Sequence, residues 1–423
     1  MGTRLGLSMF QVILIVTVLG LLFPAQLFWF RAGWRSIRGI HSSGWKRFLR
    51  ILLVLAAVWL VFVLVDGIFG HFFPHRGPVF WMVTAAHLWL LPSFFAFLLV
   101  KLVHVAEWIW IRVTLPQSRS AGASSGADDE EVDLPRRSFF RYTAVIVGAI
   151  PLVAAVYGYA KERLQYTVRR VDVPIVNLPT ALDGLQIVQL SDIHIGDFMP
   201  REEIRRAVDM ANELRAHVAF VTGDFITDRH DPLETCIAEL SRLKAPLGVW
   251  GCNGNHEIYA DAEERAQELF QKYGMRLLRQ ENAPLRWRGG EINLIGVDYQ
   301  REILLKDERR PMLTAIESLV RRNVPNVLLS HNPNSFYRAA ELGIELSFAG
   351  HTHGGQVQVE ILDHRWSPAR FITSFVAGLY ALPMGGSTSR AFLYVNRGLG
   401  TIGVPVRLGA EPEITLLTLR ASG

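Results

Sequence analysis

The amino-acid sequence predicts a protein of two parts, an N-terminal bundle of about four transmembrane helices followed by a layered α/β domain. Half of the 423 residues are hydrophobic and the mean hydropathy is positive, which is unusual for a soluble domain. Apolar runs long enough to cross a bilayer as helices occupy residues 9–30, 51–73, 79–103 and 142–160. Beyond residue 161, short apolar runs alternate with segments of helical period, which is typical of sheets covered by helices.

Basic residues in the short loops predict the orientation of these helices, because Lys and Arg accumulate on the cytoplasmic side. The loop between the first two runs contains Arg31, Arg35, Arg38, Lys46, Arg47 and Arg50. The next loop contains only Arg76. The first loop is therefore expected inside, and after four helices the C-terminal domain is expected on the external, periplasmic side of a bacterial inner membrane. A cytoplasmic domain remains the alternative, because basic residues also follow the fourth run.

The stretch between the third and fourth runs divides into two segments. Residues 115–135 change from small polar residues to acids, which predicts a disordered linker after the helices of residues 1–114. The following stretch PRRSFFRY is similar to a twin-arginine export signal, with Arg136 and Arg137 before two aromatic residues and an apolar run. We expect residues 136–160 to combine this signal with the fourth helix, which would make the twin-arginine translocation machinery a partner. The alternative is a simple cytoplasmic anchor.

Residues 161–423 form the expected α/β domain, and its strand-length runs end in polar clusters. These runs read LQIVQLSDIH, HVAFVTGD, LGVWGCNGNHE, EINLIGVDY, PNVLLSHNPN and IELSFAGHTHGG. Each is rich in Val, Ile, Leu and Phe and stops at Asp, Asn, His or Gly, as buried strands do. Ligands of open α/β sheets lie beyond the carboxyl ends of strands. The polar clusters therefore lie where a functional site is expected.

These clusters supply oxygen and nitrogen donors that suit divalent cations. The donors are Asp192, His194, Asp224, Asn255, His256, His331, His351 and His353. In a strand, side chains two residues apart point the same way, so Asp192 and His194 can address one point. The same spacing relates His351 to His353, with Thr352 turned away. Each residue alone would be an ordinary cap or surface residue, and only their concurrence favours a metal site.

Five stretches resemble, in order, the signature blocks of the calcineurin-like metallophosphoesterase superfamily. They read SDIHIGD, GDFITD, GNHE, LSHNP and GHTHGGQ. Two flanking stretches, NLPTALDGLQIVQLSD and YVNRGLGTIGVPVRLGAEPEITLLTL, resemble its bacterial membrane-anchored YkuE-like phosphodiesterase branch. The resemblance implies a four-layer α/β/β/α sandwich with a dinuclear metal site.

The resemblance also implies a role for each donor. One cation would be held by Asp192, His194, His353 and, as a bridging ligand, Asp224. The other would be held by Asp224, Asn255, His331 and His351. His256 would face the substrate as a general acid or stabilise transition-state charge, or else only orient Asn255. The two divalent cations would be Mn, Fe or Zn, because oxygen and nitrogen ligands do not select among them.

The reaction that the resemblance implies is hydrolysis of a phosphodiester or pyrophosphate bond by a hydroxide bridging the two cations. Residues 365–386 combine aromatic and aliphatic residues with Arg365 and Arg370, which favours a lipid-linked or other amphiphilic phosphate ester presented at the lipid bilayer. Arg397 is a candidate phosphate contact, unless it pairs with a carboxylate.

Two alternatives stay open for the function. If the domain is cytoplasmic, the substrate class would be that of a UDP-diacylglucosamine-type pyrophosphatase of lipid A synthesis. A transporter or sensor with a regulatory metal-binding domain is the other alternative, although the helices show only Asp66 as a deep charge. The net charge of +5 arises partly in the cytoplasmic loops, so no nucleic-acid binding is expected.

Overall fold

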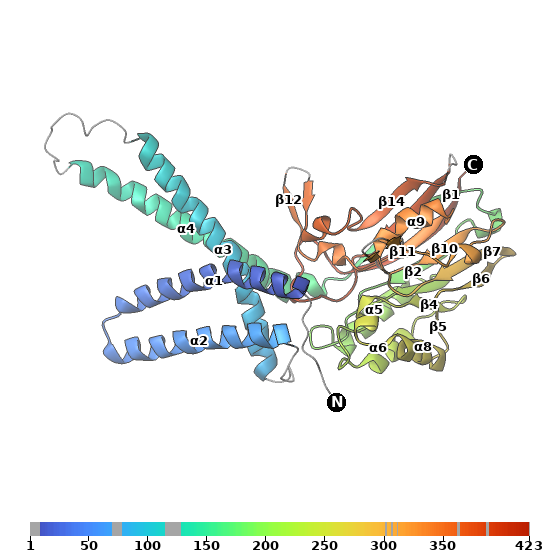
Figure 1. Ribbon diagram of the computed structural model, residues 1–423, viewed down its shortest axis with the longest axis horizontal. Coiled ribbons are helices and arrows are strands. Elements are labelled where there is room, and N and C mark those ends of the chain that lie inside the picture. Colours follow the sequence, from blue (N-terminus) through green and yellow to red (C-terminus); the bar gives the residue numbers. More distant parts are fainter. Residues whose placement is uncertain are drawn as a thin grey trace. The chain divides into compact units, whose positions relative to one another are not determined.

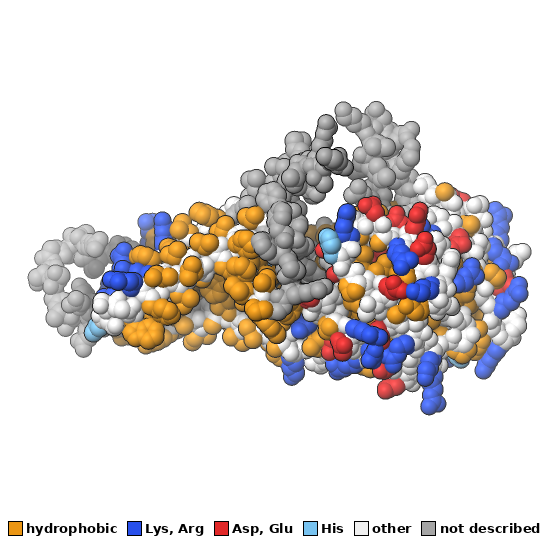
Figure 2. All heavy atoms as spheres, turned by 90° about the horizontal axis from the view of Figure 1, so that it is seen from below, with side chains coloured by type: hydrophobic (Ala, Val, Ile, Leu, Met, Phe, Trp, Pro, Cys, Tyr) orange, Lys and Arg blue, Asp and Glu red, His pale blue; other side chains and the backbone are white. Residues whose placement is uncertain are grey.

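The structure is a computed structural model that describes residues 9–69, 78–114, 128–300, 303–305, 308–310, 312–361, 364–385 and 389–422. The chain divides into two compact units, Met1–Tyr157 and Gly158–Gly423. The first unit is helical, and the second contains the sheets (Figure 1). Figure 2 shows hydrophobic side chains gathered over the helices of the first unit, and charged side chains scattered over the second.

The described residues of the helical unit form four long helices. They are α1 (Met9–Arg38), α2 (Ser43–Phe69), α3 (Pro78–Thr114) and α4 (Asp128–Ala160). Polar side chains join α1 to α3, because Gln26 donates to the Ser93 hydroxyl at 2.9 Å and accepts from the Trp89 indole at 2.9 Å. Such interhelical hydrogen bonds replace the water that an apolar environment lacks, so they help to fix how membrane helices pair.

Three helices in the described residues are long and apolar enough to cross a membrane: Ser43–Val65, Pro78–Val113 and Pro135–Leu164. They correspond to three of the four predicted runs, 51–73, 79–103 and 142–160. The remaining run, 9–30, lies in α1, but the side chains of residues 9–19 lie outside the described part of the chain. Three spans are thus supported where four were predicted, and the first one stays a prediction.

Helix α4 begins at Asp128, inside the segment predicted to be a disordered linker. Residues 115–127 of that segment lie outside the described residues. For residues 128–135 the helix replaces the predicted disorder. The reason is that an acidic run suits the positive end of a helix dipole as well as it suits a solvated linker. Arg136 and Arg137 lie within the helix, and the export signal stays a prediction.

Two mixed six-stranded sheets form the centre of the second unit. The first sheet has the order β1-β16-β2-β3-β4-β5, from β1 (Thr167–Val176), β2 (Gln186–Leu190), β3 (Val218–Thr222), β4 (Val249–Cys252), β5 (Arg276–Leu277) and β16 (Glu413–Ser422). The second has the order β14-β15-β11-β10-β7-β6, from β6 (Glu281–Trp287), β7 (Gly290–Gly296), β10 (Asn326–Leu329), β11 (Leu346–Ala349), β14 (Gly378–Pro383) and β15 (Arg390–Val395). Strands β2, β3 and β4 are parallel, as are β7, β10, β11 and β15.

Smaller elements connect these strands. Two hairpins are formed by β8 (Ile303–Leu305) with β9 (Glu308–Arg310), and by β12 (Val359–Ile361) with β13 (His364–Trp366). The α-helices are α5 (Arg201–Glu213), α6 (Leu233–Leu240), α7 (Asn255–Tyr259), α8 (Glu263–Lys272) and α9 (Phe336–Glu341). The 3₁₀ turns are η2 (Glu162–Leu164), η3 (Thr180–Leu182), η4 (Glu317–Leu319), η5 (Pro333–Ser335), η6 (His353–Gly355) and η7 (Pro368–Phe371).

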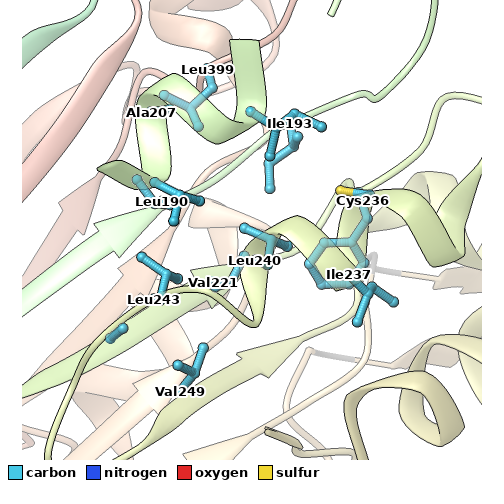
Figure 3. Close-up of a cluster of buried hydrophobic side chains, with 14 of the residues drawn as sticks. Leu190, Ile193, Ala207, Val221, Cys236, Ile237, Leu240, Leu243, Val249 and Leu399 are labelled. Carbon is cyan, nitrogen blue, oxygen red and sulfur yellow. The ribbon is translucent and has the colours of Figure 1, made fainter. Parts of the chain in front are cut away.

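Three buried hydrophobic clusters show that the second unit is a four-layer α/β/β/α sandwich. The first cluster joins α5, α6 and α8 to the first sheet and includes Leu190, Val221 and Ile237 (Figure 3). The second lies between the sheets, where Phe220 of β3 meets Phe348 of β11 edge to face at 5.0 Å between ring centroids. The third lies between the second sheet and α9. The layers are those implied by the five signature blocks.

Candidate metal centre

The predicted donors meet where the central strands of both sheets end. Asp192 and His194 follow β2, Asp224 follows β3, and Asn255 opens α7 after β4. From the second sheet, His331 follows β10, and His351 and His353 follow β11. The carboxyl ends of neighbouring parallel strands share one edge of a sheet, which is why residues far apart in the sequence converge here.

The first ligand group consists of Asp192, His194, Asp224 and His353, all buried, with one ligand atom of each within 4.8 Å of the others. The Nε2 atoms of His194 and His353 are 3.2 Å apart. His353 Nε2 lies 3.4 Å from Asp192 Oδ1, and His194 Nε2 lies 3.5 Å from Asp224 Oδ2. Two imidazole nitrogens at this distance need a proton or a cation between them.

The second ligand group contains Asp224, His331 and His351, whose ligand atoms also lie within 4.8 Å of one another. His331 Nε2 lies 3.0 Å from Asp224 Oδ2. We include Asn255 in this group, because its Oδ1 lies 2.7 Å from His351 Nδ1. Asp224 belongs to both groups, so its carboxylate is placed to contact two ions.

The chemistry of the groups fits divalent cations. Asp192 Oδ2 is buried and has no hydrogen-bond partner. An unsatisfied buried polar atom is costly, so a partner is expected at this oxygen. A cation would satisfy it, whereas sulfur ligands are not involved, since neither Cys236 nor Cys252 belongs to a ligand group. Nitrogen and oxygen donors of this kind are ligands of divalent cations.

Backbone contacts fix how the imidazoles point. His331 Nδ1 donates to the Thr222 carbonyl at 2.6 Å, which turns Nε2 toward Asp224. His353 Nδ1 lies 3.4 Å from the Gly400 carbonyl. Histidines that bind metals commonly donate their other ring nitrogen in this way, which sets the tautomer and orientation. Both rings are therefore oriented by the fold itself.

The backbone at the donors differs from the strand geometry that the spacing suggested. Asp192, His194, Asp224, His351 and His353 all have left-handed φ angles, between 48° and 73°. Strands β2 and β11 both end two residues before the first donor. The paired donors therefore lie in strained turns, and the argument from strand alternation was wrong although the side chains do meet. Such strain in non-glycine residues is typical of functional sites.

Two glycines allow the ligand loops to approach each other. A Cβ atom at Gly254 would collide with the carboxylate and backbone nitrogen of Asp224. A Cβ atom at Gly350 would collide with Ser191 Oγ and Asp192 Oδ2. Any larger residue at either position would push a carboxylate out of its ligand group.

Glu257 is a residue of the site that the sequence reasoning missed. Its buried carboxylate accepts hydrogen bonds from the backbone nitrogens of Gly254 (2.8 Å), Asp224 (2.9 Å) and Phe225 (2.8 Å). It thereby joins the loop after β4 to the loop after β3. Burial and the nearby Asp224 carboxylate raise the pKa of Glu257 to about 7. The sequence feature that could have indicated this role is the block GNHE, whose last residue is Glu257.

The two groups differ in the charge that their histidines carry. Burial lowers the pKa of His194 to about 3 and that of His351 to about 4. Burial would also lower the pKa of His331, but the Asp224 and Asp192 carboxylates outweigh it and raise this pKa to about 10. Burial raises the pKa of Asp192 to about 6. Without a cation, the positive charge of the site thus resides on His331.

His256 lies beside the first group and is only partly buried. Its backbone nitrogen donates to Asp224 Oδ1 at 3.0 Å, and its Nδ1 lies 2.7 Å from the Thr227 carbonyl. Its ring meets that of His194 edge to face, with 4.8 Å between centroids. Because the carbonyl can only accept, Nδ1 carries a proton and Nε2 remains for proton transfer.

Two tyrosines that were not predicted line the open side of the site. The Tyr299 ring lies 5.4 Å from that of His351 and 6.2 Å from that of His331. The Tyr259 ring, 59% exposed, lies 5.9 Å from that of His256 and 6.5 Å from that of Tyr299. Tyr299 ends the predicted strand run EINLIGVDY, but nothing in the sequence alone indicated that it reaches the histidines.

The predicted phosphate contact Arg397 is engaged elsewhere. Its Nη1 donates to Glu413 Oε2 at 2.5 Å, and Glu413 is fully buried. Tyr394 donates to the other oxygen of the same carboxylate. The alternative interpretation, an arginine paired with a carboxylate, is therefore the one that the contacts support. The side chain of Arg365 lies outside the described residues, and Arg370 is exposed.

An α/β/β/α sandwich whose strand ends bring together two histidine–carboxylate groups is the architecture of a metallophosphoesterase. In agreement, residues 185–355 match the model of the calcineurin-like phosphoesterase family. Residues 185–355 therefore form a calcineurin-like metallophosphoesterase domain. The expectation from the five sequence blocks is confirmed.

The relatives include proteins of animals and bacteria. The transmembrane protein with metallophosphoesterase domain of Danio rerio is 31% identical over 290 residues, 66% of this chain and 63% of the relative. The protein of the same name in Bos taurus is 31% identical over 283 residues, which are 64% of this chain and 61% of the relative. The uncharacterized metallophosphoesterase YkuE of Bacillus subtilis is 27% identical over 296 residues, which are 68% of this chain and 99% of the relative. The chain spans less than two thirds of the two transmembrane relatives, whose names and the apolar helices together indicate a membrane protein.

Proposed function

We propose that the protein is a membrane-anchored phosphoesterase with two divalent cations, which hydrolyses a phosphodiester or pyrophosphate bond of a lipid-linked or other amphiphilic substrate. The observation that carries this proposal is the position of Asp224, which contributes to both ligand groups. One carboxylate between two sets of histidines is the arrangement that a two-metal hydrolase requires. Mn, Fe and Zn all suit the donors.

The residues divide the work of hydrolysis. Asp192, His194 and His353 would hold one cation, and Asn255, His331 and His351 the other, with Asp224 shared. Two bound divalent cations supply positive charge for the phosphate oxygens and make a nearby water more acidic. As an imidazolium, His256 would give its Nε2 proton to the leaving oxygen and keep its Nδ1 proton on the Thr227 carbonyl.

A diester fits the site better than a monoester. A phosphate monoester carries up to two negative charges near neutral pH, whereas a diester carries one. The arginine that the sequence offered for phosphate binding, Arg397, is neutralised by Glu413. The remaining polar groups around the donors include histidine and tyrosine side chains. This supports a substrate of lower charge.

The side of the membrane on which the C-terminal domain lies is also part of the proposal, and it rests on the charge of the loops. The first loop carries most of the basic residues, which favours an external, periplasmic domain in a bacterial inner membrane. A lipid-linked substrate would then come from the outer leaflet. We retain export through the twin-arginine machinery as the matching route.

Hydrolysis of two chromogenic substrates tests the proposal. The full chain, purified in detergent and supplied with Mn²⁺, should hydrolyse bis(p-nitrophenyl) phosphate faster than p-nitrophenyl phosphate. The Asp192→Asn variant should lose this activity, whereas His230→Ala, whose side chain is 84% exposed, should retain it. Equal rates for the wild type and Asp192→Asn would refute the enzyme, and faster monoester hydrolysis would refute the diester preference.

A further inference from the structure

Two adjacent hydrophobic residues protrude from the second unit just after the last histidine block. Phe371 is 93% exposed and Ile372 is 74% exposed, more than any other large hydrophobic side chain in the described residues. Phe371 ends the turn η7, Ile372 follows it, and the exposed Arg370 precedes both. Large adjacent apolar side chains in this position are expensive in water, so a surface that covers them is expected.

The protruding pair, here called the apolar tip, is held in place by its own turn. The backbone nitrogen of Ile372 donates to the Ala369 carbonyl at 3.0 Å, and that of Thr373 donates to the same carbonyl at 3.0 Å. The buried Thr373 hydroxyl also donates to Asn334 Oδ1 at 2.6 Å. The tip therefore cannot fold back easily onto the domain, and its exposure is built into the fold.

The same segment is fixed to the loop that carries His351 and His353. Before the tip, Ser367 packs so closely on Gly355 that a Cβ atom there would collide with the Ser367 hydroxyl. After the tip, the Val376 carbonyl accepts a hydrogen bond of 2.6 Å from the Thr352 hydroxyl. Contacts on both sides thus tie the apolar tip to the metal centre.

Gly158, in the last turn of helix α4, belongs to the second unit and contacts Val406 and Arg407 there. Gly158 O accepts from the backbone nitrogen of Arg407 at 3.5 Å, and a Cβ atom on Gly158 would lie 2.7 Å from Val406 Cγ1. Leu408 pairs in turn with Val357, four residues after His353. The candidate membrane span that contains Gly158 continues to Leu164. The chain therefore enters the domain beside the histidine loop.

Arg407 makes this connection direct. Its side chain is fully buried, and its guanidinium donates to the carbonyls of His353 (3.4 Å), Gly400 (3.1 Å from Nε) and Ala410 (2.9 Å). Arg407 thus contacts both the backbone of Gly158 and the backbone of a metal-centre histidine.

We propose that Phe371 and Ile372 insert into the interfacial layer of the bilayer, with Arg370 beside the lipid phosphates. Phe, Ile and Arg are the residue types that bind membranes in this way. Two apolar side chains suffice, because helix α4 already holds the domain at the membrane and makes the contact intramolecular. The contact does not depend on hydrolysis. If the proposed function holds as well, it presents lipid phosphate esters to the metal centre.

A fluorophore at the apolar tip can test this contact in the full chain. Both native thiols, Cys236 and Cys252, are fully buried, and burial raises their pKa well above the ordinary value, so an added cysteine is labelled selectively. Phe371→Cys carries the probe, an environment-sensitive dye. Val176→Cys is the matched control, because Val176 is 40% exposed at the far end of β1, about 30 Å along that strand from its start.

The labelled chains are placed in nanodiscs of phosphatidylcholine and phosphatidylglycerol, with and without bromine on the acyl chains. Bromolipids should quench the Phe371→Cys probe at least about fivefold more than the Val176→Cys probe. Adding Ile372→Asp should bring the quenching at position 371 down to the control level. Equal quenching at the two positions would overturn the proposal, as would quenching that Ile372→Asp leaves unchanged. Disulfide-linked dimers of the unlabelled Phe371→Cys chain would identify a second copy as the partner that covers the tip and would overturn the proposal too.

Discussion

The two ligand groups share Asp224 but are built differently. All residues of the first group are at most 3% exposed, and their nitrogen and oxygen atoms approach to between 3.2 and 3.5 Å. The second group includes His351, which is only partly buried, and Tyr299 lies against it. The comparison indicates that the first cation would be enclosed by the fold, whereas the second would face the substrate.

The groups also differ in how ready they are to bind a cation. His194 and His353 have lowered pKa values and are neutral at physiological pH, as ligands must be. His331 holds a proton up to a pKa of about 10, because two carboxylates surround it. The first group is thus prepared for its cation by burial, and the second must release a proton first.

The largest effect is expected where the two groups meet. Asp224→Asn removes the shared charge and should lower kcat/KM for bis(p-nitrophenyl) phosphate by at least about a thousandfold, because both cations lose a ligand. Steady-state kinetics of the full chain in detergent measure this loss, with His230→Ala as the control. A loss smaller than about tenfold would show that Asp224 does not join the two groups.

The difference in proton content predicts that only the second cation binds with a steep pH dependence. His331 must lose its proton, so affinity for the second cation should rise by up to about tenfold per pH unit as pH increases toward 10. Affinity for the first cation should level off above pH 6, where Asp192 is ionised. Mn²⁺ titrations by calorimetry at several pH values measure both. Two parallel pH profiles would contradict the contrast.

Substitution of Tyr299 should affect the open side alone. Tyr299→Ala removes a ring beside His351 without removing a ligand, so we expect KM for the diester to rise roughly fivefold and the metal content to stay unchanged. Kinetics and elemental analysis of the same sample separate the two effects. Loss of one cation in this variant would mean that the ring supports the metal centre instead of the substrate.

The smallest effect is expected at Thr352, between the two histidines of the last block. The sequence suggested a side chain turned away from the cations, but its hydroxyl donates to the Val376 carbonyl. Thr352→Val should therefore retain most activity and lower the free energy of unfolding by about 1 kcal/mol. Thermal unfolding of the full chain in detergent is the measurement, and an unchanged midpoint would show that this hydrogen bond contributes nothing.

Local motifs predicted the donors well because each block lies in one short stretch of sequence. Asp192 and His194 were identified together in SDIHIGD, although a strained turn and not a strand brings them together. The residues that were missed act over long sequence distances. Glu257 joins two strand ends, Tyr299 reaches His351 from another loop, and Arg407 contacts His353 from 54 positions away. Nothing in their own neighbourhoods reveals these contacts.

Hydropathy predicted the helices of the membrane part, whereas composition did not predict the helix that begins at Asp128 in the expected linker. Three apolar runs became helices that can span a bilayer, because length and composition decide that property. The acidic composition from Asp128 onward predicted a solvated linker, but these residues lie in helix α4. Charge alone does not distinguish a linker from the start of a long helix.

The metal content of three chains tests the central claim most directly. Elemental analysis of the full chain after equilibration with Mn²⁺ should find two cations per chain in the wild type. The variants His353→Ala and His351→Ala should each retain one, since these histidines belong to different ligand groups. A wild type that binds at most one cation, or variants that keep both, would contradict a site with two cations around Asp224.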